Sequence, residues 1–242
     1  MNNSISSIPF GNLALALIPA LAVVGILYTW AHDYRKSLYA LARMLVQLLL
    51  IGYFLSYVFE TNNGGIVAVM LAIMLCAASW ISMRTARQSL RKWFPKALVS
   101  IALGGGITLL VITQAVLQLK PWYLTTFMIP LAGMIFSNAM NSISLAAERL
   151  SAEMAQGSHY EKARNIALQA ALIPITNMLL AVGLVALPGI MTGQILSGVS
   201  PLLAVRYQIM VMCMVYGSAG ISAACFLVLA RPEVRTAHSD AG

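Results

Sequence analysis

The chain has 242 residues, of which 60% are hydrophobic and only 9% are Asp, Glu, Lys or Arg. Soluble domains carry about 25% charged residues, so a chain this poor in charge is unable to cover a surface that faces water. The composition therefore excludes an ordinary soluble domain and predicts a membrane protein. The net charge of +8 is explained by basic loops retained on one side of a membrane, and we expect no nucleic acid partner.

Long apolar stretches recur along the whole chain. About 20 apolar residues, at 1.5 Å per residue, cross the roughly 30 Å hydrocarbon layer of a bilayer. By this measure the sequence predicts an all-α polytopic membrane protein, with residues 1–242 as one transmembrane domain. The predicted membrane helices cover about residues 10–31, 41–59, 65–83, 97–119, 123–146, 168–188 and 205–230. Pro201 fits the start of the last helix, because a proline at the first helical position loses no hydrogen bond.

The basic residues predict the orientation of the chain. If the N-terminus lies outside, the predicted loops place thirteen of the 15 Lys and Arg residues inside and leave only Lys120 and Arg206 outside. The positive-inside rule favours this arrangement over its reverse. We therefore expect seven membrane helices, an outside N-terminus and a cytoplasmic C-terminus.

Residues 189–204 connect the sixth and seventh predicted helices on the outer side. The segment is rich in Gly and Ser, and four polar side chains lie in it or just after it: Thr192, Gln194, Arg206 and Gln208. In one interpretation these four side chains line an outer vestibule. In the other, Arg206 only extends its charge to the lipid headgroups. Part of the segment could also re-enter the protein, which is tolerated where backbone lines a cavity or is buried in protein.

A second polar cluster lies in the fifth predicted helix. Asn138 and Asn141 are three residues apart, and Ser142 follows directly. Residues three or four apart share one face of a helix. Amides that face lipid are costly, so we expect this face to look into the protein. It either forms hydrogen bonds between helices, worth about 0.6 kcal/mol each on average, or lines a translocation path.

The loop 147–167 differs from the rest of the chain and contains six charged residues of both signs. Its two halves have helical character, and Gly157 between them can turn the chain. Such a loop is either a solvated connector or a docking surface for a soluble partner. The candidate docking residues are Glu153, Gly157, Ser158, His159, Glu161, Lys162 and Arg164. The sequence contains no GxxxxGK(S/T) phosphate loop, so any ATP chemistry needs another chain.

Catalytic and metal-ligating patterns are scarce. The three histidines form no recognisable Ser/His/Asp set, so we expect no enzyme activity. The adjacent His32 and Asp33 would point about 100° apart on a helix, which is a poor arrangement for binding one ion. The 14 methionines suit flexible apolar packing, with soft-metal ligation at one or two of them as the alternative. The metal ligands, if there are any, stay unassigned.

Three segments carry a resemblance to a known family: ARMLVQLLLIGYFL (42–55), PLAGMIFSNAMNSISLA (130–146) and ALIPITNMLLAVGLVALPGIMTGQILSGVSPLLAVRYQI (171–209). They resemble the FetB-type permease subunits of ABC transporters, which are associated with iron export, over about residues 40–230. The resemblance implies a homodimeric permease of the inner (plasma) membrane that pairs with a separate ATPase subunit. Plant members are linked to aluminium tolerance and to nucleotide-sugar transport, so the substrate is not uniform across the family.

The resemblance also bears on the charged loop. In similar sequences this loop carries a Leu-Gly-Ala-(Ser/Thr) turn, and here it reads Gln156-Gly157-Ser158-His159. The glycine that turns the chain is retained and its neighbours are more polar, which favours docking of the ATPase at this loop.

We therefore expect a permease subunit that exports iron or another metal and binds no cofactor of its own, with ATP and Mg held by the partner ATPase. Two alternatives stay open. One is ATP-driven efflux of a nucleotide sugar or another organic anion, for which Arg206 would be an outer contact. The other is a seven-helix membrane protein that does not transport.

Overall fold

The computed structural model describes residues 9–30, 34–60, 63–84 and 90–239, and within these ranges the secondary structure is helical, with no strand. The chain divides into two compact units, residues 1–61 and residues 62–242. The all-α prediction is therefore confirmed. His32 and Asp33 lie outside the described residues.

The first unit is a helical hairpin. It consists of α1 (Phe10–Leu15), α2 (Leu17–Trp30) and α3 (Tyr34–Glu60), and α2 packs against α3. The rings of Tyr28 and Tyr34 meet edge to face, with centroids 5.1 Å apart, where the chain passes between these two helices. No residue of α2 is buried. An apolar helix with no fully buried residue needs lipid or another protein surface to cover it.

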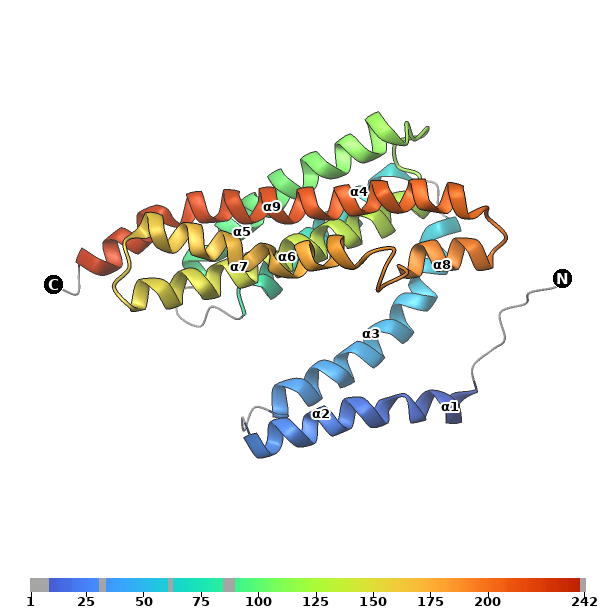
Figure 1. Cartoon of the computed structure of the whole chain (residues 1–242). Helices are drawn as coiled ribbons and strands as arrows, with labels where there is room; N and C mark the ends of the chain where they lie inside the picture. The colour runs from blue at the N-terminus through green and yellow to red at the C-terminus, as the bar shows by residue number, and fades with distance from the viewer. Residues whose placement is uncertain (1–8, 31–33, 61–62, 85–89, 240–242) are drawn as a thin grey trace. The chain divides into compact units, whose positions relative to one another are not determined.

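The second unit is a bundle of longer helices (Figure 1). Its elements are α4 (Gly64–Ser82), α5 (Leu90–Leu110), the π-helical turn η1 (Val111–Val116), α6 (Thr125–Ala155), α7 (Tyr160–Ala181), α8 (Gly189–Leu196) and α9 (Pro201–Ser239). Prolines lie inside α5, α6 and α7. Membrane helices tolerate such prolines because neighbouring groups re-satisfy the freed backbone carbonyls.

Helix α6 is the centre of this bundle and packs against α4, α5, α7 and α9. Its buried face is made of small and branched side chains three or four residues apart: Ala132, Ile135, Ala139, Ile143 and Ala146. Small residues let helix backbones approach closely, which favours helix association in membranes. Helices α5 and α9 approach closely at Gly104, where an added Cβ would meet the backbone nitrogen of Ser222 at 2.6 Å. The interior of the bundle is therefore tightly packed.

The helices of the second unit alternate in direction, and this defines two opposite ends. At the first, the start of α4 lies against the start of α6, because a Cβ on Gly64 would lie 3.1 Å from the ring of Tyr123. Helix α8 packs beside the first turns of α9 at this same end, which we call the α8 end (Figure 1).

The turn between α6 and α7 lies at the other end, which we call the Gly157 end. Here the ring of Trp93, near the start of α5, contacts the ring of Phe226 in α9, with centroids 5.6 Å apart. Arg206 and Leu227 of α9 mark the two ends and are separated by 21 residues. At 1.5 Å per residue this corresponds to about 30 Å, the thickness of the hydrocarbon layer.

Five helices among the described residues are long and apolar enough to cross a membrane: Gly11–Trp30, Gly64–Ser82, Trp93–Val116, Thr125–Ala155 and Pro201–Arg231. Helices α3 and α7 occupy the other two predicted positions. Helix α7 is the more polar of the two in its first turns, where Glu161, Lys162 and Arg164 lie. Its C-terminus falls at Ala181, ahead of the predicted residue 188, and Gly183 with a φ of +82° follows.

The loop 147–167 is helical in both halves, as predicted, and the segment 189–204 is more helical than expected. In the loop 147–167, α6 continues to Ala155 and α7 starts at Tyr160, which leaves a turn of four residues around Gly157. In the segment 189–204, residues Gly189–Leu196 form the short helix α8, and α9 begins at Pro201 as predicted. Helix α8 was not predicted, because Gly189–Leu196 contains no run of apolar residues long enough to indicate a helix.

Candidate functional site

The turn at Gly157 is held by hydrogen bonds and one ion pair. Gly157 has a φ of +79°, which a glycine adopts without steric cost. Its N–H donates to the carbonyl of Met154 at 3.0 Å, and the N–H of Ser158 donates to the carbonyl of Glu153 at 3.2 Å. The Glu153 carboxylate accepts from Arg149 Nη2 at 2.6 Å and from Ser158 Oγ at 3.4 Å. These contacts give the turn a defined shape.

The turn is also attached to the C-terminal part of α9. The Tyr160 hydroxyl donates a hydrogen bond to the backbone carbonyl of Leu227, and the Arg231 guanidinium lies 5.8 Å from the centre of the Tyr160 ring. Arg231 Nη2 is also 4.0 Å from Glu161 Oε1, but both side chains are largely exposed, so this pair contributes little. We call Tyr160, Leu227 and Arg231 the α9 clasp.

The Tyr160 hydroxyl stays a donor at neutral pH. Burial raises its pKa above the ordinary value near 10, while the charges of Arg164 and Arg231 lower it by less. The phenol is therefore protonated across the physiological range, and the hydrogen bond to Leu227 persists there.

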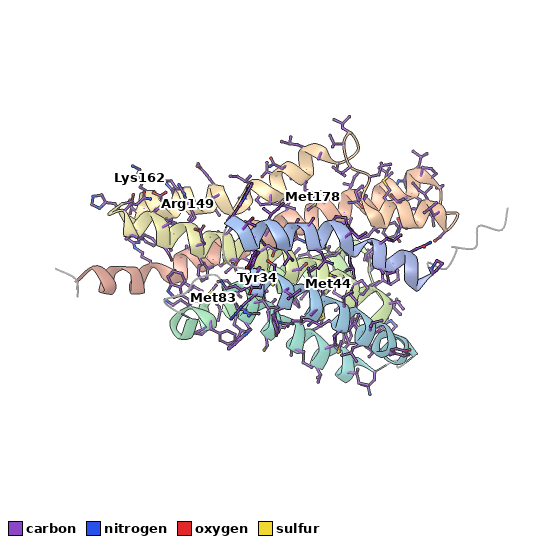
Figure 2. All side chains as sticks on the ribbon, turned by 90° about the horizontal axis from the view of Figure 1, so that it is seen from below. Tyr34, Met44, Met83, Arg149, Lys162 and Met178 are labelled. Atoms are coloured by element: carbon purple, nitrogen blue, oxygen red, sulfur yellow. The ribbon has the colours of Figure 1, made fainter. Side chains whose placement is uncertain are left out.

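The predicted docking residues divide into contact and support residues. Gly157, His159, Glu161 and Lys162 are exposed, and Ser158 and Arg164 are partly buried. Glu153 is 6% exposed, so it supports the turn and is not available to touch a partner. Figure 2 shows the Lys162 and Arg149 side chains at this end, with Met178 further along α7. The predicted docking residues that are accessible therefore lie in the turn itself and in the first turn of α7.

The polar residues of α6 point only in part where the sequence predicts. Ser142 is buried, Asn138 is partly buried and donates from Nδ2 to the carbonyl of Met134 at 2.8 Å, and Asn141 is exposed. The expectation that both amides look into the protein does not hold for Asn141 within the single chain. The reason is that alanine and isoleucine side chains already fill the inward face of α6.

Helix α7 repeats this pattern. Its buried face consists of Ala163, Ala167, Ala171 and Ile175, while Asn165, Gln169 and Thr176 are exposed. Exposed amides and hydroxyls at membrane depth need water or protein to face them. The outward sides of α6 and α7 are therefore candidates for a surface that lines a polar path.

The four residues of the predicted vestibule do not face one way. Thr192 and Arg206 are exposed, Gln194 is partly buried, and Gln208 is buried. Residues two apart on a helix point about 200° apart, so Arg206 and Gln208 lie on nearly opposite sides of α9. Gln208 belongs to the face of α9 that also carries the buried Ala204 and Met212, one helical turn away on either side. The four polar residues lie near one end, as predicted, but the helices leave Thr192 and Arg206 exposed and bury Gln194 in part and Gln208 fully.

Metal-ligating side chains do not gather in the part of the chain that is described. No group of three or more His, Cys, Asp or Glu residues in the described ranges is arranged to hold an ion. Cys76 and Cys213 are exposed and Cys225 is partly buried, and all three are free thiols.

The α9 clasp is the feature that sequence reasoning missed. Tyr160 and Leu227 are 67 residues apart, and Leu227 contributes its backbone carbonyl, so no side-chain pattern reports the contact. Arg231 was counted only as a basic residue of the inner side, and its position over the Tyr160 ring depends on how α7 and α9 meet.

The bundle, with a charged turn at one end and a short helix at the other, defines a polytopic helical membrane protein. The family described as "Uncharacterised protein family (UPF0014)" matches residues 10–234, and the chain belongs to this family.

Several relatives are similar over most of their length. The "UPF0014 membrane protein slr1647" of Synechocystis is 36% identical over 74% of this chain and 75% of its own. The "Probable iron export permease protein FetB" of Escherichia coli is 32% identical over 89% of this chain and 90% of its own. The "Protein ALUMINUM SENSITIVE 3" of Arabidopsis thaliana is 31% identical over 90% and 86%. No solved structure matches the chain significantly.

Proposed function

We propose that the chain is the permease subunit of an ABC transporter in the inner (plasma) membrane that exports iron or another metal. The similarity to a protein named as an iron export permease, over 89% of this chain, supports this assignment. A permease moves its solute without transforming it, so no catalytic residue is assigned. ATP and Mg would be bound by the separate ATPase subunit, and this chain would act as a homodimer.

The observation that carries the proposal is the separation of two specialised ends by one continuous helix. Helix α9 runs from α8 to the α9 clasp, across about 30 Å. A transporter driven from one side of a membrane needs such a connection, because the energy is released at one surface and the solute leaves at the other. Within unit 62–242, α9 runs between the two ends and contacts both α8 and Tyr160 of α7.

The distribution of basic residues supports the orientation of this unit. Among the residues whose side chains are described, the side of the Gly157 end carries Arg84, Lys96, Arg149, Lys162, Arg164 and Arg231, and the α8 end carries Lys120 and Arg206. The positive-inside rule then assigns the Gly157 end to the cytoplasm. This supports an outside N-terminus and a cytoplasmic C-terminus if all seven helices span the membrane.

The mechanism we propose is alternating access. The ATPase subunit binds the exposed turn around Gly157, and its closure on ATP displaces the start of α7. Because the Tyr160 hydroxyl is hydrogen-bonded to the Leu227 carbonyl, the displacement passes into α9 and reaches the α8 end. A rigid helix transmits such a shift over its length, which is a physical connection between the two sites.

The path itself would lie between two copies of the chain. The interior of the bundle is closed by packed alanines and branched side chains, while Asn141 on α6 faces outward. A second copy, facing the outward sides of α6 and α7, would enclose these polar groups and remove the cost of exposing them to lipid.

The test is the ATPase rate of the reconstituted complex in the presence of candidate solutes. We expect metal ions or metal chelates to stimulate ATP hydrolysis. If only nucleotide sugars stimulate ATP hydrolysis, the solute is an organic anion and the assignment to a metal is wrong. An intact complex that responds to no solute and moves none would argue for a membrane protein that does not transport.

Asn141→Leu tests the path in the same system. We expect transport to fall by roughly tenfold, the loss for a contact worth ~1.4 kcal/mol in the rate-limiting state, with expression unchanged. Met134→Leu, two turns away on the same face of α6, is the control, because it leaves the polarity of that face unaltered. If the loss of transport equals the loss of folded protein, the amide has only a structural role.

A further inference from the structure

Three consecutive glycines lie in the interior of helix α5, and packing explains only two of them. A Cβ on Gly104 would lie 2.6 Å from the backbone nitrogen of Ser222, and a Cβ on Gly105 would lie 3.1 Å from the side chain of Ile135. A Cβ on Gly106 would meet no atom within 4 Å. Gly106 is therefore not needed for a close approach of helices within the chain.

A glycine without a packing role weakens the helix that contains it. Glycine loses more backbone freedom than alanine on entering a helix, and the difference lowers the equilibrium constant for the helical state by about fivefold. At Gly106 the chain has this loss with no contact that offsets it. The backbone of α5 is thus easier to bend at this residue than on either side of it.

The regular hydrogen-bond pattern of α5 also changes shortly after Gly106. Residues Val111–Val116 form the π-helical turn η1, and the N–H of Leu117 donates to the carbonyl of Ile112, five residues back, at 2.9 Å. Single π-helical turns within α-helices are rare, occur frequently at functional sites and are one of the identified causes of helix kinks. The bend point at Gly106 is therefore followed by a second irregularity.

Two threonine hydroxyls in the same stretch bond to the backbone of α5. Thr108 Oγ1 donates to the carbonyl of Gly104 at 2.7 Å, and Thr113 Oγ1 donates to the carbonyl of Leu109 at 2.8 Å. Such bonds to a carbonyl four residues back slightly destabilise a helix and often bend it. Three independent features thus weaken residues 107–116, which we call the outer α5 segment.

Helix α9 differs from α5 at the same level of the bundle. The two helices run in opposite directions, and Gly104 lies against Ser222. The outer α5 segment therefore lies at about the depth of residues 210–219 of α9, near the α8 end. This stretch of α9 is α-helical at every residue. A weakened segment and a continuous helix accordingly lie beside each other.

We propose that α5 bends at Gly106 and that the outer α5 segment moves as one piece when the α8 end opens. This inference rests on the proposed function and adds to it the moving element of the outer gate. Leu109 and Ile112 are buried in the bundle, and bending would withdraw them from it. Hinges of this kind are a few residues that absorb the change in backbone angles.

The first experiment stiffens α5 with Gly106→Ala in the complete complex, permease with ATPase. Alanine fits this position without a clash. We expect the thermal midpoint to rise by about 2–4 °C. Export of Fe²⁺ from the cytoplasmic side of proteoliposomes should fall by about fivefold, because the bent state loses population by that factor. The ATPase subunit should still bind.

Gly217→Ala is the matched control. Gly217 lies inside α9, is partly exposed like Gly106, and a Cβ there also meets no atom within 4 Å. The thermal midpoint should rise by a similar amount. Export of Fe²⁺ should stay at the unmodified rate, because the proposed mechanism needs α9 to be rigid.

The second experiment measures amide hydrogen exchange of the unmodified complex in nanodiscs and needs no variant. The outer α5 segment should exchange severalfold faster than residues 210–219 of α9. Gly106→Ala should slow exchange in the outer α5 segment and leave α9 unchanged.

The outcomes separate the hinge from the proposed function. If the unmodified complex exports Fe²⁺ and Gly106→Ala matches it, the hinge is wrong and the proposed function stands. Equal losses of export in the two alanine variants, or a loss that accompanies dissociation of the permease dimer, would also overturn the hinge. If no ion is exported at all, the proposed function fails, and the exchange rates still decide whether α5 bends at Gly106.

Discussion

The two ends of unit 62–242 differ in whether their buried polar groups have hydrogen-bond partners. At the Gly157 end, Glu153 is paired with Arg149 and Ser158, and Tyr160 is bonded to Leu227. At the α8 end, the amide oxygens of Gln194 and Gln208 are buried without a partner in the described part of the chain. Both ends are built on the same helix, α9. The comparison teaches that burial of polar groups alone does not define a functional end.

The difference in pairing separates two kinds of recognition. Paired groups give a surface a fixed shape, which is what a protein partner contacts. Unpaired acceptors keep their capacity to interact and favour any ligand that satisfies them. This difference favours the proposal that a protein partner docks at the Gly157 end and that solute contact occurs at the α8 end.

The largest effect is expected from Gly157→Pro. Proline fixes φ near −65° and has no N–H, so it is incompatible with the φ of +79° and with the hydrogen bond to Met154. We expect ATPase binding and solute-stimulated ATP hydrolysis to be abolished while membrane insertion survives, measured by pull-down of the ATPase subunit and by insertion into the membrane fraction.

Gly157→Asn is the control for this change. Asparagine tolerates the left-handed region better than other residues, and a Cβ at this position meets no atom within 4 Å. Docking should be largely kept. Unchanged transport by the proline variant would show that the ATPase does not bind at this turn.

A smaller effect is expected from Tyr160→Phe. It removes one hydrogen bond between α7 and α9, so the free energy of unfolding should fall by about 1 kcal/mol. Solute-stimulated ATP hydrolysis should fall severalfold while the ATPase subunit still binds. Tyr123→Phe makes the same chemical change at the α8 end and should leave coupling intact. If solute-stimulated ATP hydrolysis is equal in the two variants, the α9 clasp plays no part in the proposed mechanism.

The smallest effect is expected from Arg206→Ala. Its side chain is exposed on the side of α9 away from Gln208, as suits an anchor to lipid headgroups, so ion export should change by less than about twofold. Parallel assays with a nucleotide sugar sharpen the comparison. If the substitution lowers transport of the nucleotide sugar alone, Arg206 lines the translocation path and the solute is an anion.

The sequence predicted the candidate ends better than the directions of their side chains. Loop 147–167 was recognisable from its charges, and the α8 end from its glycines and polar residues. The orientations of Asn141, Arg206 and Gln208 were not, because spacing along a helix predicts which residues share a face and leaves open which neighbour that face meets. Glu153 was placed among the docking residues for the same reason, although the turn buries it.

By itself the sequence determined that the chain is a helical membrane protein with a charged turn at Gly157, since hydropathy and turn chemistry are local properties. The tertiary structure decided that Tyr160 meets Leu227, that α6 turns Asn141 outward and that the Gln208 side-chain oxygen is buried with no donor among the described residues. These features depend on which helix surfaces pack together, and that choice follows from the summed contacts of residues far apart in the chain.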